Sequence, residues 1–172
     1  MELKQLFTVQ NIIENHIKKL ASMEENILGE ENIFHLRFLA LQVKTSEIAN
    51  LTKCYKYSKI KENIPKEKLM IRYMDAMKLL LSIGNVHEFN IINEDAICVV
   101  DKEQNIIKLF SYIFDDITSL KHALEKDNYI DSLSIYTRLF SNFVNLGELL
   151  GLNFEEVYNF YLHQVEILKT HV

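Results

Sequence analysis

The chain has 172 residues, of which 48% are hydrophobic and 25% charged, and a formal net charge of −5. This length allows one domain, residues 1–172, to bury a substantial core, and the composition is typical of a globular protein. The negative charge disfavours nonspecific nucleic-acid binding, no apolar window is long enough for a membrane span, and the first residues lack a signal-peptide pattern. We therefore expect a soluble, cytoplasmic protein that binds neither nucleic acid nor a membrane.

With only one proline and four glycines, the chain has few residues that break helices or form tight turns, so long helices are expected. Hydrophobic periodicity predicts an all-α, single-domain bundle of about six helices, at residues 2–24, 32–53, 66–83, 105–125, 128–150 and 153–170. Gly84 and Asn85 predict the end of the third helix. Asp127 or Asn128 is expected to cap the fifth, and Asn153 the sixth in a capping box with Glu156. Residues 86–104 could form a loop, a short hairpin or a distorted helix.

The stretch from Phe38 to Gly84 contains two apolar helical segments, each with one carboxylate and a cation three residues before it. Lys44 precedes Glu47 in the first segment, and Arg72 precedes Asp75 in the second. Residues three apart share a helix face, so each helix presents a cation beside a carboxylate. Such pairs, taken alone, are typical of exposed surfaces and contribute only about 0.2–1 kcal/mol each.

Several motifs in this stretch and around it resemble those of the dimeric all-α dUTP diphosphatases. Residues 40–58, ALQVKTSEIANLTKCYKYS, resemble the first metal-binding helix of that family, and residues 70–84, MIRYMDAMKLLLSIG, resemble the second. The amino-terminal LFTVQNIIENHI and the later LGELLGLNFEEVYNFYL are similar to further family segments. The resemblance covers most of the chain in the same order.

The resemblance implies an all-α NTP pyrophosphatase-like fold, a homodimer, and Mg²⁺-dependent hydrolysis of dUTP or dUDP to dUMP by a water nucleophile. Family members hold the metal with Glu-x-x-Glu on one helix and Glu-x-x-Asp on the other. Glu47 and Asp75 match two of these four positions and are the candidate metal-binding and catalytic residues. Gln10 and Lys56 are the surviving candidates for contact with a deoxyuridine nucleotide.

The chain departs from the family where the chemistry is expected. Lys44 and Arg72 occupy the other two acid positions, Lys78 replaces a family histidine, and the family's carboxy-terminal Lys, Asn and Arg are not in place. Ammonium and guanidinium groups have no lone pair for a hard cation, so we expect a weak or absent Mg²⁺ site. Lys44 and Arg72 could instead contact nucleotide phosphates directly.

Three hypotheses follow from these observations. In the first, Lys44 and Arg72 replace the ion as counter-charges, and a catalytically weak or inactive homologue retains a nucleotide-binding or protein-interaction role. In the second, the protein is an active dUTPase or a related pyrophosphatase with a modified metal site that uses Glu14, Asp115 or Asp116. In the third, it is an unrelated helical interaction protein. Tyr161 and other helical tyrosines could stack on a base, although a place in the core is more typical.

Overall fold

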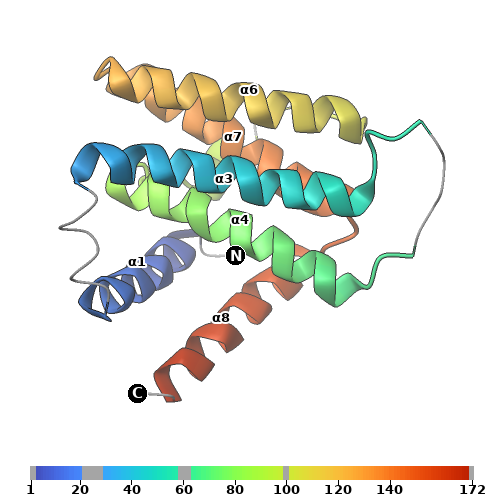
Figure 1. Cartoon of the computed structure of the whole chain (residues 1–172), viewed down its shortest axis with the longest axis horizontal. Coiled ribbons are helices and arrows are strands. Elements are labelled where there is room, and N and C mark those ends of the chain that lie inside the picture. The colour runs from blue at the N-terminus through green and yellow to red at the C-terminus, as the bar shows by residue number, and fades with distance from the viewer. Residues whose placement is uncertain (1–2, 21–28, 58–62, 99–100, 171–172) are drawn as a thin grey trace.

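The computed structural model describes residues 3–20, 29–57, 63–98 and 101–170. This part of the chain contains seven helices and no strand, which confirms the predicted all-α class (Figure 1). The helices are α1 (Leu3–Leu20), α3 (Glu30–Thr52), α4 (Lys66–Val86), α5 (Glu94–Cys98), α6 (Ile106–Glu125), α7 (Tyr129–Leu149) and α8 (Phe154–Thr170).

Helix α4 is the centre of the bundle. It packs against α1, α3, α7 and α8, while α6 lies along α7 and also contacts α3. In Figure 1, α3 lies between α6 and α4, and α1 and α8 lie on the other side of α4. Eleven residues of α4 are buried, which is expected for a helix with neighbours on several sides.

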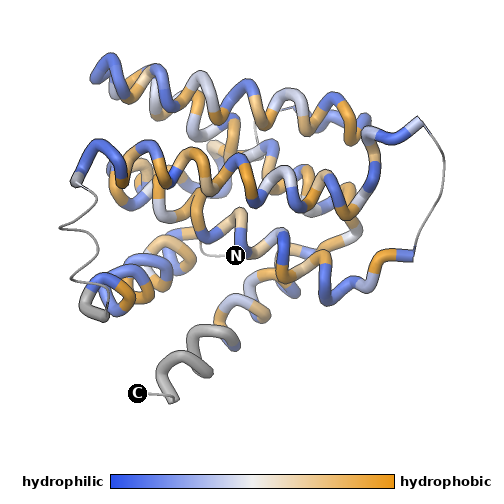
Figure 2. The backbone as a smooth tube through the Cα atoms, in the orientation of Figure 1, coloured by the Kyte–Doolittle hydropathy of each residue, from blue (hydrophilic) through white to orange (hydrophobic). Residues whose placement is uncertain are grey.

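Helices α1, α6, α7 and α8 are amphipathic, whereas α3 has hydrophobic residues on its exposed side as well as in the core. Figure 2 shows hydrophobic and hydrophilic residues interleaved along the helices, as expected for helices that bury one stripe in a shared core. None of the described helices is both long enough and apolar enough to cross a bilayer.

Local capping explains several helix starts, and two predictions of this kind are confirmed. The Asn128 side chain accepts a hydrogen bond from the backbone N–H of Asp131 at the start of α7. At the start of α8, Asn153 accepts from the Glu155 N–H, and the Glu156 carboxylate accepts from the Asn153 N–H. These bonds satisfy backbone donors that the first turn of a helix leaves without an intrahelical partner.

The predicted end of α4 at Gly84 is wrong, because the helix continues to Val86. Gly84 lies inside the helix and makes room for α1 and α7. A Cβ atom there would lie 2.2 Å from the Tyr136 hydroxyl and 2.7 Å from the Phe7 ring. The Tyr136 hydroxyl donates to the Leu80 carbonyl at 2.9 Å, so a polar contact holds the two helices at this close approach. The glycine therefore serves packing rather than helix termination.

The described residues of the segment that the sequence left undecided form turns and the short helix α5, so the described chain has seven helices where six were expected. At the start of α5, Asn93 accepts from the Ala96 N–H, and Glu94 accepts from the Leu3 N–H at 2.8 Å, which joins α5 to the start of α1. Residues 99 and 100 of this segment, and residues 21–24 of the first predicted helix, lie outside the described residues.

We predict that Gly84→Ala destabilises the protein by about 1–3 kcal/mol, because the overpacking cost exceeds the gain in helix propensity. Gly147→Ala is the matched comparison on α7, where the added Cβ would meet the Tyr73 hydroxyl at 2.8 Å, a less severe overlap. Urea unfolding of both variants measures the difference. An alanine at position 84 that leaves stability unchanged or raises it would contradict the packing argument.

Candidate functional site

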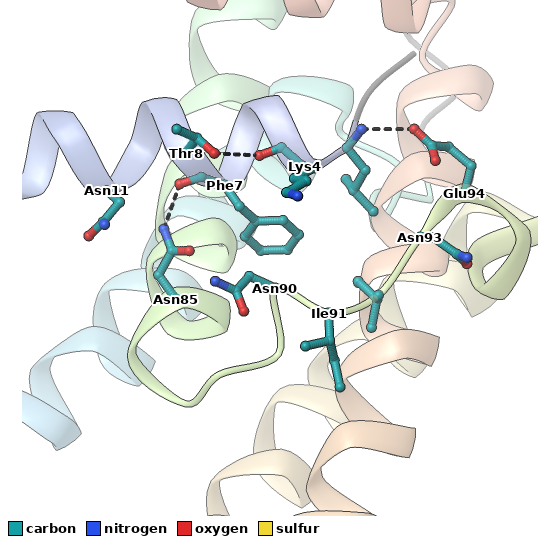
Figure 3. A pocket seen from close by; sticks show the side chains of 11 residues that line it. Lys4, Phe7, Thr8, Asn11, Asn85, Asn90, Ile91, Asn93 and Glu94 are labelled. Carbon is teal, nitrogen blue, oxygen red and sulfur yellow. Dashed lines mark hydrogen bonds between the residues drawn. The ribbon is translucent and has the colours of Figure 1, made fainter.

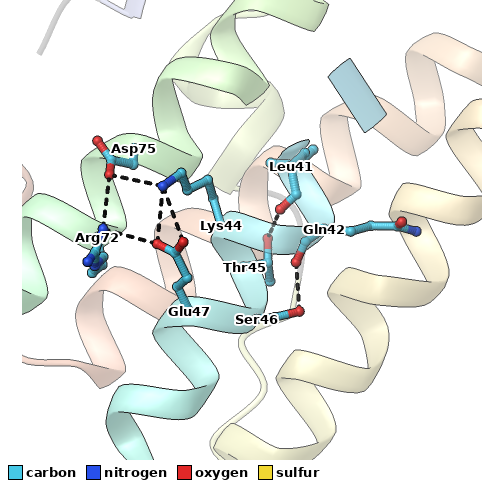
Figure 4. A network of polar contacts seen from close by, with 8 residues as sticks. All are labelled: Leu41, Gln42, Lys44, Thr45, Ser46, Glu47, Arg72 and Asp75. Atoms are coloured by element: carbon cyan, nitrogen blue, oxygen red, sulfur yellow. Dashed lines mark hydrogen bonds and ion pairs between the residues drawn. The ribbon is translucent and has the colours of Figure 1, made fainter. Parts of the chain in front are cut away.

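Four charged side chains form a closed network between α3 and α4 (Figure 4). The Lys44 Nζ atom lies 3.2 Å from Glu47 Oε2 and 3.6 Å from Asp75 Oδ2. The Arg72 Nη1 atom lies 3.2 Å from Glu47 Oε2 and 3.7 Å from Asp75 Oδ2. Each cation thus contacts both carboxylates, one on its own helix and one on the facing helix.

The network has no net formal charge and is only partly exposed. Its side chains are between 29% and 39% exposed, and the two positive and two negative formal charges cancel. At this exposure each pair contributes little alone, about 0.2–1 kcal/mol, but four alternating charges hold α3 and α4 at two points. The arrangement therefore orients both carboxylates without an added ion.

The donor set of the network does not fit Mg²⁺. This ion requires oxygen ligands at about 2.0–2.1 Å in near-octahedral geometry, and the cluster provides two carboxylates and two cations. A divalent ion about 5 Å from either Lys44 or Arg72 would be repelled by several kcal/mol at an effective dielectric constant near 20. Among the described residues, no three His, Cys, Asp or Glu side chains are grouped so that they could hold a metal.

A cavity of about 590 Å³ opens beside the network, between α1, α3, α4 and α8. Lys44 and Asp75 belong to both the network and the cavity wall. Ile13, Ile17 and Leu79 supply apolar lining, and polar and charged side chains from all four helices converge on the same wall. A concave site that combines apolar lining with convergent polar groups is typical of small-molecule binding.

Gln10, a predicted nucleotide contact, is in this cavity and is held by two neighbours. It is only 5% exposed; its Oε1 accepts a 2.5 Å hydrogen bond from the Tyr161 hydroxyl, and its Nε2 donates to Glu14 at 3.2 Å. These bonds fix the orientation of the amide. Burial, together with the nearby Glu14 charge, raises the pKa of Tyr161 well above its ordinary value, so this hydroxyl remains a donor.

Lys78 also lines the cavity. Its Nζ lies 5.9 Å from the centre of the Tyr161 ring, a cation–π arrangement between α4 and α8. Burial lowers the pKa of Lys78, and the carboxylate of Asp75 opposes that shift. The structure thus places a cation close to Asp75 inside the cavity.

Two more cations of the cavity were missed in the sequence, Lys18 on α1 and Arg37 on α3. Arg37 lies seven residues, or two helical turns, before Lys44, so their shared face could have been read from spacing. The position of Lys18 could not be predicted in this way, because no local sequence pattern indicates that α1 packs beside α3 and α4.

The remaining predicted residues lie elsewhere. Lys56 is exposed in the turn after α3 and is not part of the cavity wall. Asp115 and Asp116 line a separate cavity on α6 and α7, where Arg138 and Asn142 donate hydrogen bonds to the buried Asp116 carboxylate. Of the alternative acids, only Glu14 lies in the same cavity as Asp75.

A larger cavity of about 890 Å³ lies between the start of α1 and residues 90–94 (Figure 3). Its rim carries asparagines, among them Asn11, Asn85 and Asn90, with Phe7 behind them. None of the predicted site residues lines it. The smaller cavity beside the charge network is therefore the candidate functional site.

We predict that the α3–α4 contact between Glu47 and Arg72 is measurable in a double-mutant cycle. Glu47→Gln and Arg72→Gln should be coupled by about 0.5–1 kcal/mol in urea unfolding, and the coupling should weaken in 1 M salt. The control is the Lys121–Glu125 pair, which has similar exposure but lies within the single helix α6 and has its atoms 3.8 Å apart. Its coupling should be smaller, about 0.3 kcal/mol. Equal couplings, or coupling insensitive to salt, would contradict a closed network.

Comparison with known proteins agrees with the helical architecture and with the motifs. A family model described as dUTPase matches residues 2–168. Searches of curated proteins and of solved structures found no significant match. The family match extends over nearly the whole chain and includes the helices that carry the charge network and the cavity. The chain therefore belongs to the all-α dUTPase family.

Proposed function

We propose that this protein binds a deoxyuridine nucleotide in the cavity between α1, α3, α4 and α8 without a divalent metal, and that its hydrolytic activity is weak or lost. The observation that carries the proposal is the closed network of Lys44, Glu47, Arg72 and Asp75. Members of the family typically use Mg²⁺. In this chain two cations contact the carboxylates that match the family's ligand positions, and the donor set does not fit the ion.

The loss of hydrolysis follows from what a metal supplies in phosphate chemistry. A divalent ion neutralises phosphate charge and activates water, and neither Lys44 nor Arg72 can activate a water molecule by coordinating it. Both can still attract phosphate oxygens by charge and hydrogen bonding. Binding and hydrolysis are thus separable in this site.

The second candidate is an active pyrophosphatase with a modified metal site. One observation favours it: Glu14 lines the same cavity as Asp75 and supplies a carboxylate from α1. Against it, Lys18, Lys44 and Lys78 line that cavity too and would repel a divalent ion. We therefore favour metal-free binding.

Two further properties of the family are proposals for this chain. We expect it to form a homodimer, which light scattering at several protein concentrations would test. The cytoplasmic location expected from the sequence also stays a prediction.

Calorimetric titration with a non-hydrolysable dUTP analogue, with and without Mg²⁺, tests the proposal directly. We expect binding in the presence of a chelator, with no gain in affinity on adding Mg²⁺, because Lys44 and Arg72 already supply the positive charge. Pyrophosphate release from dUTP should be close to background. Binding that requires Mg²⁺, or turnover abolished by the chelator, would establish the active-enzyme alternative, and no binding of any deoxyuridine nucleotide would overturn the proposal.

Restoring the family's acids should restore a metal site. We predict that the double variant Lys44→Glu with Arg72→Glu is less stable than the parent without metal, because four carboxylates then repel one another. Mg²⁺ or Mn²⁺ should raise its melting temperature by mass action, whereas the parent should show no such shift.

The matched control is Lys44→Gln with Arg72→Gln, which removes the cations without adding carboxylates. This variant should respond to Mg²⁺ much less than the double glutamate variant. A parent protein that is stabilised by Mg²⁺ as strongly as the double glutamate variant would show that the native cluster already holds the ion.

A further inference from the structure

The wall of the candidate cavity carries more cations than carboxylates, whereas the network beside it has two of each. Among the described residues of the wall, Lys18, Arg37, Lys44 and Lys78 are cationic, and Glu14 and Asp75 are carboxylates. The described wall thus has a formal excess of two positive charges, in a chain whose net charge is −5. Such an excess in a partly apolar hollow favours an anionic ligand.

The cations approach the cavity from three helices. Lys18 comes from α1, Lys78 from α4, and Arg37 from α3, two turns before Lys44. Lys44 is already paired with Glu47 and Asp75. Arg37 is half-buried and, within the described chain, has no carboxylate within ion-pair distance. Its guanidinium is the group best suited to hold two phosphate oxygens at once.

We propose that the cavity selects a nucleoside monophosphate over the triphosphate, with Arg37 holding the phosphate. This inference rests on the proposed metal-free function and adds the class of ligand. A phosphate monoester carries about −1.5 to −2 charges at neutral pH, which matches the excess of the cavity.

A triphosphate does not match the site in the same way. It carries roughly twice the negative charge, and magnesium normally balances the surplus on phosphate substrates. Asp75 lies beside Lys44 in the wall, and the network to which both belong has no net charge, so it adds no positive charge to balance further phosphates. A magnesium ion bound to the triphosphate would be repelled by Lys44 and Arg72. The surplus charge is therefore left without compensation in the cavity.

Calorimetry in a chelator, with the full chain, tests the inference. The ligands are dUMP, the non-hydrolysable dUTP analogue, deoxyuridine and inorganic phosphate. We expect dUMP to bind about tenfold more tightly than the triphosphate analogue, and deoxyuridine and inorganic phosphate to bind more weakly than dUMP. Equal or tighter metal-free binding of the triphosphate would overturn the inference and leave the proposed function standing. Equal binding of deoxyuridine and dUMP would also overturn it, since the phosphate would then contribute nothing.

Variants test the role of Arg37. Arg37→Gln should weaken dUMP binding about tenfold, and Arg37→Lys, which keeps the charge but not the paired donors, should give an intermediate loss. Lys121→Gln, in a different cavity on α6, is the control and should leave the affinity unchanged. If Arg37→Gln does not fold, as judged by circular dichroism, Arg37→Lys decides. Full affinity in the folded variant would exclude Arg37 as the phosphate ligand.

Discussion

The candidate site depends on one electrostatic constraint, the close approach of Glu47 and Asp75 to the same two cations where α3 packs against α4. Two carboxylates brought together by helix packing repel each other unless positive charge is placed among them. A mobile ion is one solution, and its occupancy depends on concentration. Here Lys44 and Arg72 each contact both carboxylates, so the compensating charge is part of the covalent chain. The α3–α4 contact is therefore neutral without a bound ion.

The core fixes where this constraint acts. On α4, Tyr73, Leu80 and Gly84 face α7: Tyr73 donates to the Phe143 carbonyl, and Leu80 accepts from Tyr136. At 100° per residue, Asp75 and Lys78 point to roughly the opposite side of the helix. Because one face of α4 packs closely against α7, its other face lines the cavity between α1, α3 and α8.

The same scaffold can serve ligands of different charge because the sign of a site is set by few side chains. The chain belongs to the all-α dUTPase family. The described wall of the cavity has a positive excess although the molecule is acidic overall. Local charge in a partly dry hollow, rather than net charge, determines which ligand is attracted.

The sequence by itself determined the helical class, most helix positions, the Asn128 and Asn153 caps, the pairing of Lys44 with Glu47, and the family. These features depend on residues near one another in the chain. Only the tertiary structure decided that Lys44 reaches Asp75, that Arg37 and Lys18 share one cavity, and that Gly84 lies inside α4. Such contacts depend on the crossing and register of distant helices, which local periodicity does not specify.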